Sequence, residues 1–259
     1  MTWKAGPKRI LITGASGGLG GALARYCAGP DARLSLWARD EARLAATAES
    51  CRVRGAAVEI RSLDLSDASA AIAALAAEDA ADPFDVALLA AGLGDVRTAG
   101  AVVEDPMVVA RLGQVNFVAP AAMAATLAQR MAARGGGSIV LIGSAAAFHA
   151  LPFATAYAGS KAGLARFAAA LNLAVRSHGV SVTLASPGFI DTEAARQIPG
   201  PKPLIMSADD AAARIVKAAM RGKSHIVMPW PFALLRLIDR AMPGPLRSRL
   251  LRSLTPPGS

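Results

Sequence analysis

The chain has 259 residues, of which 53% are hydrophobic and 18% are charged, and its formal net charge is +9. This composition predicts a globular protein with a sizeable core and excludes a largely disordered chain. The arginines are scattered singly with few aromatic residues beside them, which disfavours a nucleic-acid surface. A solvated arginine-rich surface, a phosphorylated ligand or an anionic lipid is compatible with the charge.

The cysteines, the histidines and the N-terminal residues limit the expected compartment and the kinds of site. Cys27 and Cys51 are too few for a disulfide framework or a metal cluster, so we expect small, packed side chains in a cytoplasmic protein. His149, His178 and His225 lack carboxylate or cysteine partners at ligand spacing, so no metal site is expected. The N-terminal residues run from two lysines directly into a strand, which is untypical of a secretory signal. No apolar run approaches about 18 residues, so no transmembrane helix is expected.

Short aliphatic runs alternate with alanine-rich stretches of helical spacing. The runs are residues 9–13, 33–37, 57–63, 85–91, 138–143, 180–186 and 225–228. This alternation predicts an α/β fold with a doubly wound, seven-stranded parallel sheet and helices on both faces. Because no repeat or linker interrupts this pattern, residues 1–228 are expected to form one domain.

Local signals predict where several helices begin and end. Asp105 and Pro106 are expected to open a long helix that ends near the glycines at 135–137. Gly179 is expected to terminate the helix that begins near residue 155. The sequence Ser-Ala-Asp-Asp at 207–210 resembles a capping box at the start of another helix.

Residues 229–259 differ from the rest of the chain because prolines divide them into two short amphipathic segments. The apolar positions are 232, 234, 235, 237, 238, 241 and 242 in the first segment, and Leu246, Leu250, Leu251 and Leu254 in the second. The second segment is distinctly basic, with Arg247, Arg249 and Arg252. Two helices forming a C-terminal arm are expected. The arm can pack on its own domain, on a neighbouring subunit or on an anionic membrane surface, and the sequence leaves these alternatives open.

A glycine-rich segment, ILITGASGGLGGALARY, joins the first predicted strand to the helix that follows it. Gly14, Gly18 and Gly20 allow backbone amides to approach a pyrophosphate closely. The N-terminus of the helix adds a partial positive charge at the same point. In this position between strand and helix, the segment predicts a dinucleotide site.

A second motif, FATAYAGSKAGLARF, places Tyr157 and Lys161 one helical turn apart. Reduction of a carbonyl requires an acid beside its oxygen, and a free phenol with a pKa of about 10 is a weak candidate. A lysine at about 4 Å would lower the pKa of the phenol by up to about three units. The pair alone is a weak motif, so its meaning depends on the rest of the chain.

The TGxxxGxG loop and the YxxxK pair together resemble the short-chain dehydrogenase/reductase family. Further matches follow in that family's order across residues 9 to about 228, namely Ala90–Gly92, Asn116, Ser144 and Ser186–Thr192. The resemblance implies a single-domain Rossmann fold and an oxidoreductase. It further implies that Asn116, Ser144, Tyr157 and Lys161 are catalytic. Tyr157 would be the acid or base, Lys161 would also hold the nicotinamide ribose, Ser144 would hold the carbonyl oxygen and Asn116 would bind a relay water.

The end of the second strand indicates which nicotinamide cofactor is bound. An NAD enzyme usually places an acid there, but this chain has Ala38 followed by Arg39, whose guanidinium suits a 2′-phosphate. NADP(H) is therefore expected, unless Arg39 is only a solvated charge. Asp40 is expected to cap the next helix, and Asp64 can cradle adenine or cap a turn. The implied cofactor-binding set is Gly14, Ser16, Gly17, Gly18, Leu19, Gly20, Arg39, Asp64, Leu65, Ala91, Gly92, Tyr157, Lys161, Pro187, Gly188, Ile190 and Thr192.

The sequence departs from the family pattern at Ala90, where asparagine is usual, and at Gly143, where serine is common. Neither change removes a proton-transfer group. The expected substrate-side residues are Leu93, Ala145, Phe148, His149, Leu151, Phe153, Phe189 and part of 192–206. Because most are apolar, a hydrophobic or mid-sized carbonyl is expected. His149 can contact a polar group of the substrate or be an ordinary loop histidine.

The expected function is reversible hydride transfer between NADP(H) and a small carbonyl or secondary-alcohol substrate. One alternative is a non-catalytic, NADP(H)-binding regulatory or scaffold protein. Another is a membrane-surface reductase of lipid or polysaccharide-precursor substrates, held at the inner face of the membrane by the C-terminal arm. The resemblance also implies a homodimer or homotetramer formed through the long helices at 105–134 and 155–178.

Overall fold

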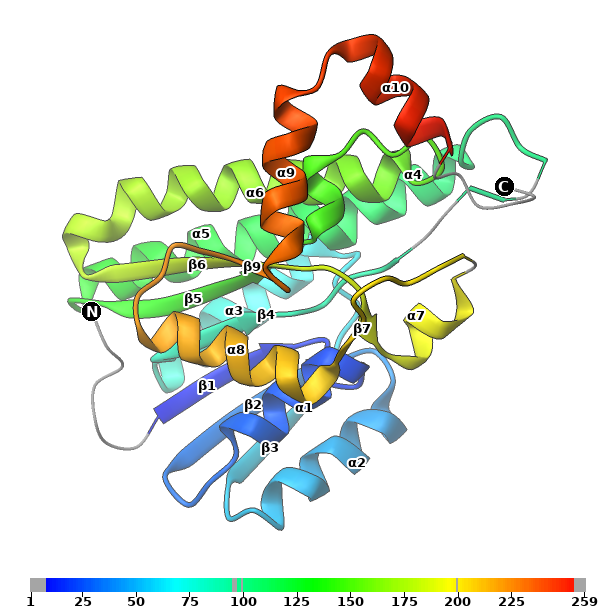
Figure 1. Ribbon diagram of the computed structural model, residues 1–259. Coiled ribbons are helices and arrows are strands. Elements are labelled where there is room, and N and C mark those ends of the chain that lie inside the picture. Colours follow the sequence, from blue (N-terminus) through cyan, green and yellow to red (C-terminus); the bar gives the residue numbers. More distant parts are fainter. Residues whose placement is uncertain (1–7, 95–96, 99, 199, 254–259) are drawn as a thin grey trace.

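The computed structural model describes residues 8–94, 97–98, 100–198 and 200–253. Residues 1–7, which include the N-terminal lysines considered for a secretory signal, lie outside this range. Leu254 of the second predicted amphipathic segment also lies outside it. Seven parallel strands form one sheet in the order β3-β2-β1-β4-β5-β6-β9 (Figure 1), which confirms the predicted sheet. Their bounds are β1 (Lys8–Thr13), β2 (Ala32–Ala38), β3 (Ala57–Ser62), β4 (Val86–Leu89), β5 (Gly137–Ile142), β6 (Val180–Pro187) and β9 (His225–Met228).

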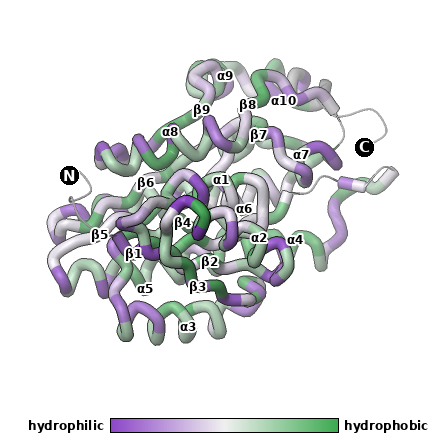
Figure 2. Tube along the Cα trace, turned by 90° about the horizontal axis from the view of Figure 1, so that it is seen from below, coloured by the Kyte–Doolittle hydropathy of each residue, from purple (hydrophilic) through white to green (hydrophobic). Residues whose placement is uncertain are grey.

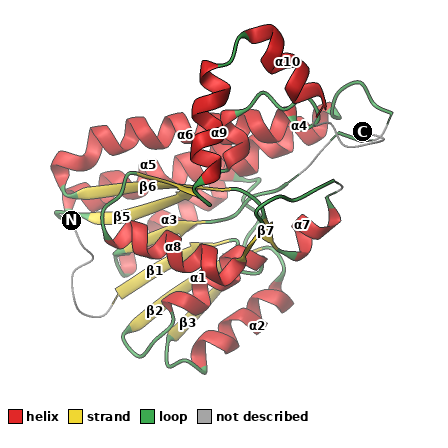
Figure 3. Ribbon diagram, in the orientation of Figure 1, coloured by secondary structure: helices red, strands yellow, loops and turns green. Residues whose placement is uncertain are grey.

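Helices cover both faces of the sheet, as Figure 3 shows. One face packs against α1 (Gly18–Cys27), α2 (Glu41–Arg52) and α8 (Ala208–Met220), and the other against α3 (Ala68–Ala81), α5 (Ala119–Ala133) and α6 (Thr155–Val175). Successive side chains of a strand point to opposite faces, so β2 sends Leu36 into the first core and Trp37 into the second. The continuous apolar runs in the sequence reflect this burial on both faces.

The long helix predicted from Asp105 onward is present, but it has three parts. These are α4 (Pro106–Gly113), a π-helical turn η1 (Gln114–Val118) and α5. The carboxylate of Asp105 accepts hydrogen bonds from the backbone N–H groups of Met107 and Val108, at 2.7 and 3.3 Å. The π-turn was not predicted, and such turns are frequent at functional sites. Here it contains Asn116.

By length and composition alone, the helical stretch Pro106–Ala133 could cross a membrane. The stretch contains no uninterrupted apolar run of about 18 residues, because polar residues such as Arg111, Gln114 and Asn116 interrupt it, so the sequence did not predict this result. Its side chains Leu112, Met123 and Leu127 are buried in the protein, and Met123 and Leu127 belong to the core on one face of the sheet. This packing is that of a core helix.

Shorter elements lie between β6 and α8. Strand β7 (Ile190–Asp191) pairs with β8 (Met206–Ser207), and α7 (Glu193–Gln197) lies between them. The hydroxyl of Ser207 accepts a hydrogen bond from the backbone N–H of Asp210 at 3.1 Å, so it caps α8 as predicted. Helix α6 is followed by a 3₁₀ turn, η3 (Arg176–His178). The helical segment ends at Gly179, which has φ +77°. The positive φ explains the glycine.

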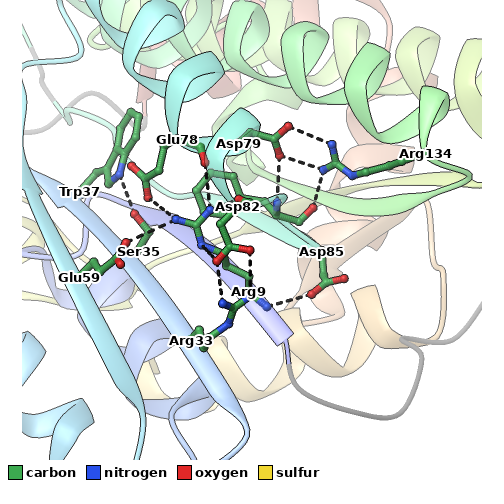
Figure 4. Close-up of polar contacts among 11 residues, drawn as sticks. Arg9, Arg33, Ser35, Trp37, Glu59, Glu78, Asp79, Asp82, Asp85 and Arg134 are labelled. Atoms are coloured by element: carbon green, nitrogen blue, oxygen red, sulfur yellow. Dashed lines mark hydrogen bonds and ion pairs between the residues drawn. The ribbon is translucent and has the colours of Figure 1, made fainter.

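A buried arginine at the start of β1 forms a network of ion pairs and hydrogen bonds at the amino end of the sheet (Figure 4). Arg9 is only 5% exposed, and its guanidinium pairs with Glu78 at 3.2 Å and with Asp82 at 3.1 Å. It also lies over the ring of Phe84, 4.4 Å from the centroid. Its backbone N–H donates to Asp85 at 2.9 Å. This network lies at the end of the sheet opposite to the carboxyl ends of the strands.

The C-terminal arm consists of α9 (Pro231–Ala241) and α10 (Gly244–Ser253), which project from the body of the molecule at the top of Figure 1. Hydrophobic and hydrophilic residues alternate along both helices (Figure 2), in agreement with the predicted amphipathic pattern. Helix α9 contacts β9 and a 3₁₀ turn, η2 (Ala145–Phe148), that follows β5. Helix α9 therefore packs on its own domain.

Candidate active site

The carboxyl ends of the central strands meet at one edge of the sheet. Thr13 of β1 lies beside Leu89 of β4, which in turn lies beside Leu141 of β5. The residues that follow these strands therefore emerge together. The strand order reverses between β1 and β4, and a crevice outside such a reversal is the usual binding place in open α/β sheets.

The glycine loop after β1 fits a pyrophosphate. Gly14 has φ +71°, and a Cβ there would lie 2.7 Å from the Cα of Ala91, so only glycine fits. A Cβ on Gly20 would lie 2.1 Å from the carbonyl oxygen of Gly14. Gly17 and Gly18 are exposed, and no side chain in the described part of the chain caps α1. The amides of its first turn are thus available to an anion.

The adenine side contains the predicted residues and one that was missed. The guanidinium of Arg39 lies 3.9 Å from the carboxylate of Asp64, and both are about half exposed. Asp64 also accepts a hydrogen bond from the backbone N–H of Ser66 at 2.9 Å, so it caps a turn as well. A cavity of about 370 Å³ is lined by Asp64, Ser66, Met107, Ala110, Arg111 and Gln114. Arg111 is a second basic residue on this side. The sequence did not predict it, because Arg111 is distant from Arg39 along the chain.

The charges on this side favour an ionised Asp64. The pKa of Asp64 is lowered chiefly by the hydrogen bond from the Ser66 backbone, and Arg39 and Arg111 lower it further. Asp40 caps α2 as expected, because its carboxylate accepts from the backbone N–H of Arg43 at 3.0 Å. Leu65 is buried. Because the Asp40 carboxylate caps a helix, Arg39 is the half-exposed charged side chain at the end of β2 that can meet a ligand.

The turn after β6 lies against the glycine loop. A Cβ on Gly18 would lie 2.6 Å from the Thr192 side chain, so Thr192 covers the start of α1. The hydroxyl of Thr192 also caps α7 by accepting from Ala195 N–H at 3.1 Å. Pro187 ends β6 and Ile190 begins β7. The structure thus places Thr192 of the predicted cofactor set beside the glycine loop.

The four predicted catalytic residues come from three elements. Tyr157 and Lys161 lie in the first turns of α6, Ser144 caps η2, and Asn116 lies in the π-turn. A Cβ on Gly92 would lie 3.1 Å from Oδ1 of Asn116 and 3.3 Å from Nζ of Lys161. The two side chains therefore converge on the segment after β4. Their catalytic roles stay a prediction.

Asn116 and Lys161 are buried and hydrogen-bonded to the backbone. The side chain of Asn116 accepts from Leu93 N–H and donates to the Leu93 carbonyl, both at 2.8 Å. The Nζ of Lys161 donates to the carbonyl oxygen of Ile142 at 2.9 Å. Asn116 thus fixes the backbone that follows β4, and Lys161 fixes the end of β5.

The pKa of Tyr157 is shifted in the direction opposite to the expectation. Burial lowers the pKa of Lys161 to about 8. Burial also raises the pKa of Tyr157, and a hydrogen bond with the Ser144 side chain opposes this rise. The expected lowering of the Tyr157 pKa by Lys161 is therefore wrong for this structure. The physical reason is that Lys161 bonds to Ile142, while the desolvation of the phenol dominates.

A residue that the sequence did not reveal caps the helix bearing Tyr157. Glu104 is 6% exposed, and its carboxylate accepts from the Thr155 hydroxyl at 2.7 Å and from the Ala156 N–H at 3.1 Å. Ala154, the cap residue of α6 itself, offers no side-chain acceptor. Cap signals are sought next to a helix, whereas this acceptor lies 51 residues from Thr155. We therefore expect Glu104 to hold the first turn of α6, and with it Tyr157, in place.

We expect Glu104→Ala to lower kcat on the order of tenfold, because the first turn of α6 loses its cap and Tyr157 moves from its place. Glu104→Gln keeps an oxygen acceptor and should restore most of kcat. Steady-state kinetics well below the unfolding temperature of each variant, with a pH profile, provide the measurement. If Glu104→Ala lowers only the unfolding temperature and leaves kcat and its pH profile unchanged, the positioning role is wrong.

The substrate-side residues do not share one cavity. Phe148, His149 and Leu151 line a cavity of about 500 Å³ together with residues of α6 and the arm residues Asp239 and Arg247. Leu93, Ala145, Phe153 and Phe189 lie outside its lining, as do Tyr157 and Ser144. Substrate contact by these residues stays a prediction. Residue 199, within the expected segment 192–206, lies outside the described residues.

The arm covers this side of the site, which the sequence left open. Nδ1 of His149 lies 3.4 Å from the carboxylate of Asp239, so His149 is paired within the protein. The Arg236 guanidinium lies 4.5 Å from the centroid of the Phe148 ring. The rings of Phe189 and Phe232 meet edge to face at 6.4 Å. Residues of α9 therefore belong to the surroundings of the site.

Comparison with known proteins identifies the family. Residues 8–202 match the model of the short chain dehydrogenase family. The chain belongs to the short-chain dehydrogenase/reductase family. It is 31% identical to an uncharacterized oxidoreductase of Myxococcus xanthus over 95% of this chain and 97% of that protein. A second uncharacterized oxidoreductase, from Mycobacterium tuberculosis, is 33% identical over 91% of this chain and 95% of its own length.

Solved structures agree with this assignment. A short-chain dehydrogenase from Sphingobium yanoikuyae in complex with NADPH is 29% identical, with a TM-score of 0.79 over 90% of this chain and 94% of that one. A metagenomic short-chain oxidoreductase in complex with NADP is 28% identical, with a TM-score of 0.73 over 85% and 95% of the two chains. The protein is thus an oxidoreductase of this family, and several of its solved relatives hold NADP(H).

Proposed function

We propose that this protein is an NADP(H)-dependent oxidoreductase that interconverts a carbonyl compound and a secondary alcohol. The observation that carries the proposal is the convergence of Asn116 and Lys161 on Gly92, beside Tyr157 and Ser144, at the sheet edge that also holds the free amides of α1. A proton-transfer group and a dinucleotide site thus share one edge.

The chain's own residues supply binding and proton transfer. When bound, the nicotinamide supplies or accepts the hydride. The amides at the start of α1 would hold the pyrophosphate, and Lys161 would hold the ribose. The Ser144 hydroxyl donates to the carbonyl oxygen, and the Tyr157 hydroxyl gives that oxygen its proton. Lys161, with a pKa of about 8, can exchange a proton near neutral pH. Asn116 fixes the backbone of Leu93 on the other side.

The preference for NADP(H) rests on the end of β2. Ala38 is buried and provides no acid for a ribose 2′-hydroxyl, whereas Arg39 is half exposed beside Asp64. Arg111 lines the neighbouring cavity and adds positive charge. A guanidinium is suited to a 2′-phosphate. The NADP(H) complexes of solved relatives agree with this choice.

Arg39→Ala is expected to weaken NADPH binding at least about tenfold and to leave NADH binding nearly unchanged, since a charge-assisted hydrogen bond contributes about 1.5–3 kcal/mol. Cofactor titration by fluorescence provides both dissociation constants. Arg52→Ala removes the same charge near the far end of α2 and serves as the control. Equal affinities of the unmodified protein for NADPH and NADH would show that Arg39 does not select the cofactor.

A further inference from the structure

Helix α9 is fixed to the domain along one face. Phe232 is buried, and a Cβ on Gly188 would lie 2.3 Å from its ring. One turn later Arg236 lies over Phe148, and Asp239 then pairs with His149. These positions are separated by four and three residues, which is the spacing of a single helix face. The opposite face of α9 must therefore point away from the protein.

That outer face is apolar and exposed. Trp230 just before the helix is 73% exposed, and Leu237 within it is 63% exposed. The exposed apolar side chains of the arm are Trp230, Leu234, Leu235, Leu237, Ile238 and Leu246. Soluble surfaces normally carry such residues singly, and a contiguous group marks an interaction site. Nothing in the fold of the described residues covers this group.

The charge of the arm indicates what covers it. Residues 229–259 contain five arginines and a single acidic residue, Asp239. Asp239 faces inward, is 14% exposed at its side chain and pairs with His149, so it does not neutralise the outer surface. Arg249 is exposed beside Leu246 on α10. An exposed apolar helix face in a segment of net positive charge, with an exposed arginine such as Arg249 on the neighbouring helix, is the pattern of a helix lying in an anionic lipid interface.

We propose that the outer face of α9, together with α10, docks on an anionic lipid bilayer. A second copy of the chain is the weaker occupant, because a two-fold contact would bring two arms of net positive charge together, and the single carboxylate of each arm, Asp239, faces inward to His149. The inner face of α9 contacts Gly188 and Phe148 beside the site. Docking would therefore hold this side of the site close to the bilayer. The inference is independent of the reaction proposed above.

Vesicle co-sedimentation of the full chain tests the inference. Binding is expected to phosphatidylcholine vesicles that contain phosphatidylglycerol, to fall with added salt, and to be at least about tenfold weaker with pure phosphatidylcholine. Leu234→Ser with Leu237→Ser should weaken binding to the anionic vesicles at least about tenfold. Arg249→Glu should weaken it about fivefold or more. Removing the whole arm is a poorer variant, because it would uncover Gly188 and Phe148.

Val53→Ser with Arg54→Glu provides the matched control, since Val53 is 80% exposed at the end of α2, far from the arm (Figure 1). This control should bind like the unmodified protein, and circular dichroism shows whether each variant is folded. Full-length protein that stays in the supernatant with anionic vesicles at low salt overturns the inference. The inference is also overturned if Leu234→Ser with Leu237→Ser binds anionic vesicles as strongly as the unmodified protein does. A fall in oligomeric mass of that variant without vesicles would assign the face to a second copy instead. None of these measurements requires turnover.

Discussion

Tyr157→Phe is expected to lower kcat by about three orders of magnitude while the dissociation constant of NADPH stays within about twofold. The substitution removes only the phenolic oxygen, and general acid–base catalysis contributes about 10²–10⁴-fold. Phenylalanine fills the same half-buried place on α6, so the helix is not expected to change. Steady-state carbonyl reduction and cofactor titration on the same preparation provide the two numbers.

Tyr26→Phe is the matched control, because Tyr26 is the other tyrosine of the chain and is 42% exposed on α1. It should leave kcat unchanged. Turnover near the unmodified level in Tyr157→Phe would exclude Tyr157 as the acid. Absence of carbonyl turnover in the unmodified protein, with NADPH still bound, would instead support the non-catalytic alternative.

The raised pKa of Tyr157 gives the reaction a defined pH dependence. Because burial keeps the phenol protonated to higher pH, the proton donor for reduction is present throughout the neutral range. Alcohol oxidation needs the deprotonated phenol, so its rate should rise with pH through that range. Tyr157→Phe should abolish this rise in oxidation.

Asp79→Ala is expected to lower the free energy of unfolding by about 3 kcal/mol. The Asp79 side chain is completely buried and pairs with Arg130 at 2.5 Å and with Arg134 at 2.9 Å. It also accepts from the Phe84 N–H at 2.9 Å. The substitution leaves that buried N–H without its partner and separates two helices, α3 and α5, that the pairs join. Urea unfolding followed by circular dichroism measures the loss.

Asp67→Ala is the control, since Asp67 lies at the other end of α3 and only caps the helix, by accepting from Ala70 N–H at 2.9 Å in an exposed place. This substitution should lower the free energy of unfolding by about 1 kcal/mol. Equal losses in the two variants would mean that the buried pairs do not stabilise the protein beyond an ordinary cap.

The same carboxylate predicts how acid affects stability. Burial alone would raise the pKa of Asp79, but the hydrogen bonds from Arg130, Phe84 and Arg134 outweigh it and lower the pKa. A group whose pKa is lower in the folded state stabilises the protein above its unfolded pKa of about 3.9. That stabilisation is lost as the pH falls through the folded pKa. Asp79→Asn should therefore show a shallower loss of stability below about pH 4 than the unmodified chain.

The sequence by itself determined the strands, several helix caps and the family. Strands are marked by apolar runs, because a parallel strand is buried on both faces wherever it lies in the sheet. The caps formed by Asp40, Asp105 and Ser207 were predictable, because a cap bonds to an amide two or three residues away. The order of the motifs from Gly14 to Thr192 was likewise readable along the chain.

Only the tertiary structure decided the contacts between residues that are distant in the chain. Glu104 caps α6, Arg9 joins the amino end of the sheet, and α9 covers the turn after Ser144. The Tyr157 pKa belongs with them, since it depends on burial and on where Lys161 makes its hydrogen bond. Each of these depends on long-range packing, and desolvation depends on all the atoms around a group. Neither long-range packing nor desolvation can be read from a local pattern of residues.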